Sequence, residues 1–102
     1  MIKNNSGVND PKEFDKLSID EREIVMAWIN NNLLPIESFN EHGTSYELKH
    51  LCERDTGIYF TNGAFKGAML AAKYRPQDLG EINWRFTVSR KSPAFRKKAK
   101  HQ

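Results

Sequence analysis

The chain has 102 residues, of which 38% are apolar, and it carries a formal net charge of +3. This length suits one domain, and no apolar run approaches the roughly 18 residues that a membrane-spanning helix needs. A single cysteine, Cys52, excludes an internal disulfide. Together with the lack of an apolar N-terminal stretch, it favours a cytoplasmic protein with no membrane partner.

Charge is unevenly distributed along the chain. Residues 1–55 hold six Lys/Arg against eleven Asp/Glu, whereas residues 56–102 hold ten Lys/Arg against two Asp/Glu. A basic half on so small a chain is typical of a protein that binds a polyanion, most often nucleic acid. The alternative is a solvated surface with a basic tail.

The composition divides the chain into three segments. Residues 1–17 are polar and without periodicity, which predicts a flexible leader outside the core. Residues 90–102 contain many cations and no acid, which predicts a basic tail. The folded domain is then expected over 18–89, a size at which one core supplies only about 3–5 kcal/mol.

The first helix is predicted at about 19–33. Ser18 and Glu21 form a capping-box pattern at its start, and apolar residues then recur at helical spacing as far as Leu33. Pro35 prevents any continuation.

A second capping-box pattern, from Thr44 to Glu47, starts a helix that is expected to end near residue 54. A third helix is predicted at about 62–73. Its apolar stripe consists of Phe65, Ala68, Met69 and Ala72.

Two segments are predicted to be strands. Residues 58–60 are short, β-branched and aromatic, and residues 82–88 alternate between apolar and polar side chains. Because a lone strand leaves its backbone groups unpaired, the two are expected to form a ribbon. The fold class is therefore predicted as α+β and mainly helical. It is a divergent winged helix-turn-helix with three helices and a small two-stranded β-ribbon.

The third helix is the candidate DNA-reading element. Its exposed face is expected to carry Asn62, Lys66 and Lys73, which suit phosphates and base edges. Gly63 and Gly67 make this face thin, which indicates a close approach by another group. That group is either a ligand or the first or second helix of the protein itself.

The remaining expected contacts follow this helix. Arg75 lies just beyond it, Arg85 with Arg90 and Lys91 is expected to act as the wing, and the tail adds nonspecific phosphate contacts. The full set of expected nucleic-acid contacts is Asn62, Lys66, Lys73, Arg75, Arg85, Arg90, Lys91, Arg96, Lys97, Lys98 and Lys100.

Enzyme chemistry is not expected, and neither is a cofactor or a metal. His42, His50 and Cys52 lack a metal-binding spacing, and Cys52 is expected to be a small core residue. The sequence contains no nucleophile-elbow, dinucleotide-binding or P-loop motif. Three acids, Glu47, Glu53 and Asp55, are expected to form an exposed acidic surface on the second helix.

Three motifs stand out between residues 44 and 88: S-Y-x-L-K-H, T-N-G-x-F-K-G-A-M-L and N-W-x-F. In these, about half of the chain resembles small uncharacterised proteins from phages, prophages and integrative elements of Gram-positive bacteria. More distantly it is similar to winged-helix-like proteins of mobile elements, for which the resemblance implies DNA binding. This chain departs from them with Cys52 where Phe is expected and Lys73 where Gly is expected.

We therefore expect a non-catalytic DNA-binding protein of a phage or mobile element, with strandedness and oligomeric state left open. The alternative is a protein-binding inhibitor or adaptor that acts on a host enzyme or nucleoprotein complex. In that alternative the acidic half imitates DNA or contacts a basic partner through Asp20, Glu21, Glu23, Glu47 and Glu53.

Overall fold

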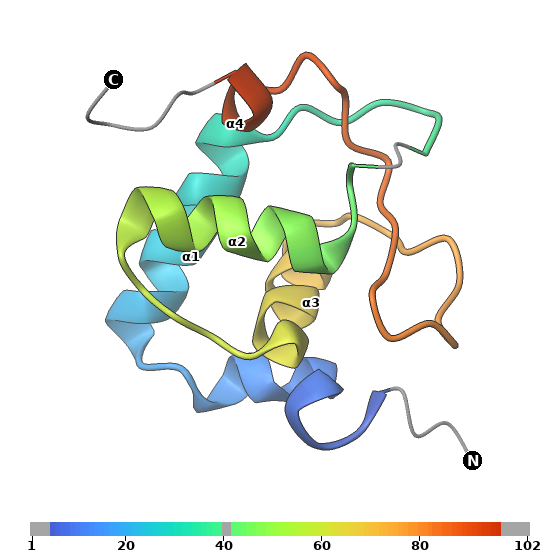
Figure 1. Ribbon diagram of the computed structural model, residues 1–102. Helices are drawn as coiled ribbons and strands as arrows, with labels where there is room; N and C mark the ends of the chain where they lie inside the picture. The colour runs from blue at the N-terminus through green and yellow to red at the C-terminus, as the bar shows by residue number, and fades with distance from the viewer. Residues whose placement is uncertain (1–4, 40–41, 97–102) are drawn as a thin grey trace.

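The computed structural model describes residues 5–39 and 42–96. The described elements in chain order are η2 (Gly7–Asn9), η3 (Pro11–Lys16), α1 (Ile19–Asn32), α2 (Ser45–Thr56), α3 (Asn62–Ala71) and α4 (Pro93–Arg96). The three long helices that the sequence predicts are confirmed to within two residues at each end (Figure 1). None of the helices in this part of the chain is both long and apolar enough to cross a bilayer.

The helix starts are fixed by local hydrogen bonds. The Ser18 hydroxyl accepts from the Glu21 N–H at 3.1 Å, and the Glu21 carboxylate accepts from the Ser18 N–H at 3.0 Å. Thr44 and Thr61 cap α2 and α3 in the same way, each accepting from a backbone N–H three residues later. These bonds satisfy N–H groups that lack a partner inside the helix.

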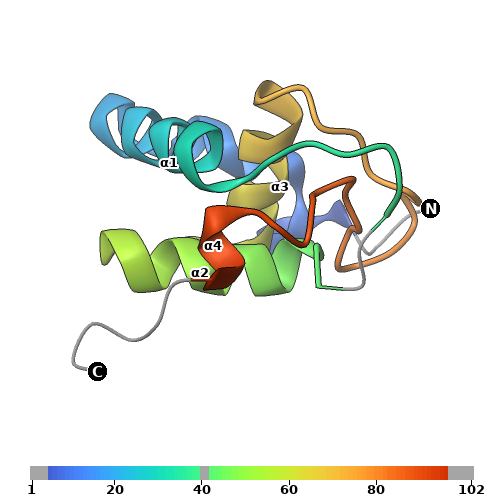
Figure 2. The same ribbon diagram turned by 90° about the horizontal axis from the view of Figure 1, so that it is seen from above.

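The core lies where the three long helices meet. Trp28 and Ile29 of α1 pack with Leu48 of α2 and with Phe65 and Met69 of α3, all of them buried. Figure 1 shows α2 crossing in front of α1, and the view from above shows the two helices at separate levels with α3 toward one end of α2 (Figure 2).

The expected two-stranded ribbon is wrong: within residues 5–39 and 42–96 no strand is formed. The predicted alternation holds over residues 84–88, where Trp84, Phe86 and Val88 are buried and Arg85 is exposed. It is wrong at Ile82, which lies in a bend and is 46% exposed. The backbone of residues 84–88 pairs with the connector that precedes α2, and only at isolated positions. The Ser45 N–H donates to the Trp84 carbonyl at 2.7 Å, and the Phe86 N–H donates to the Gly43 carbonyl at 3.0 Å.

Residues 58–60 are not the partner, because the Ile58 and Phe60 amides bond to side chains of α2. The Phe60 N–H donates to the Glu53 carboxylate at 3.1 Å, and the Ile58 N–H donates to the Thr56 hydroxyl at 3.2 Å. The winged helix-turn-helix assignment therefore does not hold, and the described fold is helical with one extended segment that contributes Trp84, Phe86 and Val88 to the core.

The predicted flexible leader, 1–17, is also wrong over residues 5–17. η2 and η3 lie along α3, and Phe14 and Leu17 pack against the core. The Asp10 carboxylate caps η3 by accepting from the Lys12 N–H at 2.9 Å. A segment without helical or strand periodicity thus forms part of the domain.

The predicted boundary at residue 89 is wrong as well, because the chain beyond it joins the core. Ala94 in α4 is buried, and its carbonyl accepts from the Arg54 guanidinium at 3.2 Å. Three expected tail contacts, Lys97, Lys98 and Lys100, lie outside the described residues.

Candidate nucleic-acid interface

Asn62, expected at the DNA surface, instead joins three parts of the protein. Its side-chain oxygen accepts from the Ser45 hydroxyl at 2.9 Å. Its amide nitrogen lies 3.0 Å from the Asn9 side-chain oxygen and 3.1 Å from that of Asn83. The Ile82 carbonyl, at 3.0 Å, is a third acceptor for the two hydrogens of this amide. These bonds occupy the side chain, so it is not presented to a base edge.

Lys66, the second expected contact on α3, is 0% exposed. Its amine donates to the Asn5 side-chain oxygen at 2.9 Å and to the Asn9 carbonyl at 3.2 Å. The amine also lies 4.7 Å from the centre of the Trp84 ring, within range of a cation–π contact. The prediction that Lys66 meets phosphates is therefore wrong, because this side chain fastens the N-terminal segment to α3.

Burial changes the acid–base behaviour of this amine. It lowers the pKa of Lys66 from its ordinary 10.5 to about 8, and the nearby Asp10 carboxylate opposes part of the shift. A neutral amine still has hydrogens to donate, so both hydrogen bonds survive deprotonation.

This pKa predicts a rise in stability with pH. Between about pH 8 and 10.5 the unfolded chain holds more protons at this site than the folded chain, so the free energy of unfolding increases across that window. Urea titrations of the wild type and Lys66→Met at several pH values isolate the effect, because methionine cannot titrate. We expect the difference in stability, wild type minus variant, to grow above pH 8, and a constant difference would contradict the assignment.

The thin face of α3 is covered by the N-terminal segment. A Cβ atom on Gly63 would lie less than 3.0 Å from backbone atoms of Asp10, and one on Gly67 would lie equally close to Pro11 and Phe14. The approach is therefore made by the N-terminal segment and not by α1 or α2. The expectation that Gly63 and Gly67 are exposed is wrong, since both are buried.

The other described candidates do reach the surface. Six cations of the C-terminal half are exposed: Lys73, Arg75, Arg85, Arg90, Lys91 and Arg96. In the described part of the chain none of the six forms an ion pair with an acid. They come from the end of α3, the extended segment, the turn before α4 and α4 itself, so no single helix presents them.

Arg85 has acidic neighbours. It lines a hollow of about 630 Å³ together with Asp78 and Glu81, which are the only acids of residues 56–102. The positive potential at Arg85 is therefore partly offset. Lys73 and Arg75 lie in a different setting, since no acid from residues 5–39 or 42–96 lines their groove.

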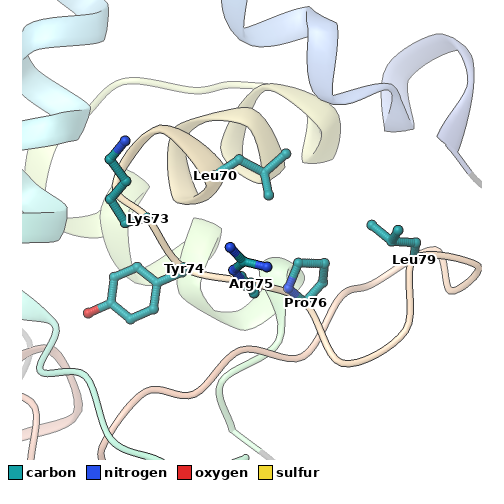
Figure 3. A pocket seen from close by; sticks show the side chains of 6 residues that line it. All are labelled: Leu70, Lys73, Tyr74, Arg75, Pro76 and Leu79. Atoms are coloured by element: carbon teal, nitrogen blue, oxygen red, sulfur yellow. The ribbon is translucent and has the colours of Figure 1, made fainter.

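This groove has a volume of about 450 Å³. Its lining is mainly apolar and includes two cations, Lys73 and Arg75. Figure 3 shows Leu70 on α3 and Leu79 on the loop beyond it, with Arg75 and Pro76 on the chain that joins them. Leu70 is 40% exposed and Leu79 is 59% exposed. The groove was not predicted from the sequence, because Leu79 lies in a turn-rich segment that carries no periodic signal.

Lys73 occupies an unusual backbone position for a lysine. It has a φ of 75° just after α3. Here the Lys73 N–H donates to the Leu70 carbonyl and the Tyr74 N–H donates to the Met69 carbonyl, each at 3.0 Å. This is the helix-ending arrangement in which glycine is normally preferred. The departure noted from the sequence, lysine where glycine is expected, thus falls on a left-handed residue that lines the groove.

The expected acidic surface on α2 is only partly present. Glu53 is buried and accepts from the Lys49 amine at 3.1 Å, and Asp55 accepts from the Trp28 indole at 2.8 Å. Only Glu47 of the three is exposed, so the others act in the fold. Cys52 is buried as predicted, and burial raises the pKa of its thiol to about 12.

Within residues 5–39 and 42–96 no group of three or more His, Cys, Asp or Glu is arranged to hold a metal ion. Comparisons with protein-family models, with curated proteins and with solved structures gave no match for this chain.

Proposed function

We propose that the protein binds DNA without catalysis, through the exposed cations of its C-terminal half. The observation that carries the proposal is the exposure of six Lys and Arg side chains that have no acidic partner among the described residues. Exposed cations of this kind attract a chain of phosphates and release its counterions. The resemblance of residues 44–74 to proteins of phages and integrative elements supports DNA as the polyanion.

The contact set differs from the one that the sequence predicts. Asn62 and Lys66 are excluded, because their polar atoms bond within the protein. Lys73 and Arg75 form one group of contacts, and Arg90, Lys91 and Arg96 form another around α4. Cations dispersed over several elements favour recognition of the phosphate backbone over reading of base edges.

The test is a titration of labelled random duplex and single-stranded DNA, followed by fluorescence anisotropy at two salt concentrations. With about six phosphate contacts, affinity is expected to fall by about 10³ between about 50 and 200 mM salt. The higher of the two affinities shows whether the protein prefers duplex or single-stranded DNA. No binding to either DNA at low salt would contradict the proposal.

A matched pair of charge reversals locates the surface. Lys91→Glu changes an exposed lysine of the basic half, and Lys12→Glu changes an exposed lysine of the acidic half. We expect Lys91→Glu to weaken binding about tenfold at low salt and to reduce the salt slope, with a much smaller effect of Lys12→Glu. Equal effects of the two reversals would contradict the proposed location.

A further inference from the structure

Two surfaces of the molecule combine exposed apolar side chains with charges of one sign. The first is the groove described above, here called the basic groove and represented by Leu70, Lys73, Arg75 and Leu79. The second is the outer side of α1, here called the acidic face. It is formed by Ile19, Asp20, Glu23, Ile24 and Ala27, all exposed.

The acidic face is one continuous side of a helix. Its positions follow the spacing i, i+1, i+4, i+5 and i+8, which spans about 140° at 3.6 residues per turn. Ile19 is 67% exposed and Ile24 is 45% exposed, while Val25 and Ile29 on the opposite side are buried. A helix with apolar side chains on two opposite sides is typically in contact with other protein on both of them.

The basic groove is held in place by its surroundings. The carbonyl of Leu79 accepts from the Trp84 indole at 3.2 Å and from the Asn5 amide, which fixes the loop while the leucine side chain stays outside. Among the residues that the structure describes, no acid lines the groove. Lys73 keeps a charged side chain in a left-handed conformation, where glycine would relieve the strain.

We propose that the protein associates with a second copy of itself, the acidic face of α1 in one copy lying in the basic groove of the other. The chain itself supplies both partners of this contact: two carboxylates between two isoleucines, and two leucines beside two cations. An amphipathic helix in an apolar groove is a common mode of recognition, and opposite charges set its orientation.

The two surfaces are different, so the contact is head-to-tail. Such contacts add copies one after another unless the rotation between them closes a ring. The average mass is therefore expected to rise with protein concentration, and to fall toward that of one chain as salt screens the charges.

Sedimentation of the full chain, without DNA, tests the contact by charge exchange. Reversing the groove with Lys73→Glu and Arg75→Glu is expected to abolish association, and so is reversing the face with Asp20→Lys and Glu23→Lys. Combining all four substitutions in one chain restores opposite charges and is expected to restore association. Asp15→Lys with Glu37→Lys, at exposed acids outside the face, is the control and should leave association unchanged.

Lys73→Gly separates binding from folding. Glycine removes a groove cation and relieves the left-handed strain, so the melting temperature is expected to rise by about 4 °C while association weakens. A purely structural role for Lys73 would not give this pair of opposite changes.

Three results would overturn the proposal. They are a single-copy mass at every concentration in low salt, association that survives reversal of the groove, and a fourfold variant that stays unassociated. Because no DNA is present, these results stand apart from the outcome of the DNA titration.

Discussion

Lys66→Glu is expected to destabilise the protein by about 3–5 kcal/mol, which is most of the stability of a domain of this size. The change leaves the Asn5 side-chain oxygen and the Asn9 carbonyl without their donor. It also places a buried carboxylate among acceptors, close enough to Asp10 for that group to influence the site. The free energy of unfolding in urea, followed by circular dichroism, measures the effect.

Two further variants keep this prediction testable if Lys66→Glu does not fold. Lys66→Met retains the apolar stem and loses only the donor, so we expect a cost of about 1–3 kcal/mol. Lys91→Glu makes the same charge reversal at an exposed site and is expected to change stability by less than about 0.5 kcal/mol. If Lys66→Glu were as stable as Lys91→Glu, Lys66 would lie at the surface after all.

Gly67→Ala is expected to have the second large effect on stability. Whether it raises or lowers the free energy of unfolding shows whether this face of α3 is exposed or covered. On an exposed helix face this substitution stabilises by about 1 kcal/mol, because alanine is the better helix former. Here the added Cβ atom meets the Pro11 carbonyl and the Phe14 side chain at less than 3.0 Å. The Pro11 carbonyl is backbone and cannot rotate away, so we expect a loss of about 2–3 kcal/mol.

Ala71→Gly is the matched control, since residue 71 is exposed at the end of the same helix. This substitution exchanges alanine for glycine at an exposed position, so we expect it to lower the free energy of unfolding by about 1 kcal/mol at most. Urea denaturation of both variants gives the comparison. A stabilised Gly67→Ala variant would contradict the packing of the N-terminal segment on α3.

The helices of this fold could be predicted because their signals are local. Ser18, Thr44 and Thr61 cap α1, α2 and α3, and each sits directly before the helix start that the sequence indicates. Alternation over 82–88 also identified the buried side chains of Trp84 and Phe86 correctly. A period of two shows which side chains face the core, but it does not show which backbone the segment pairs with.

The N-terminal segment could not be predicted, because short 3₁₀ turns have no apolar period. The signal that points to it lies in α3, where Gly63, Lys66 and Gly67 share the side that faces residues 9–14. A lysine on a helix is expected to be exposed, so the sequence assigns that side to solvent. Every residue from Gly63 to Met69 is buried. The expectation that a helix buries one face and exposes the other therefore fails for α3.

The residues of the candidate site also fall into those that were predicted correctly and those that contact the N-terminal segment. Exposure at Lys73, Arg75 and Arg90 agrees with the sequence analysis, because charge segregation is a property of composition that folding leaves largely unchanged. The misassigned residues are Asn62 and Lys66, which bond to the N-terminal segment. Predicting their roles requires knowing a contact between residues more than fifty positions apart.

Chemical labelling of lysine amines, read by mass spectrometry with and without DNA, distinguishes the buried lysine from the cations that we propose bind DNA. Lys66 attaches the N-terminal segment to α3 through its amine. We therefore expect Lys66 to label least in the free protein, and DNA to protect Lys73 and Lys91 but leave Lys12 unchanged. Labelling of Lys66 as fast as Lys91 in the free protein, or equal protection of Lys12 by DNA, would contradict these roles.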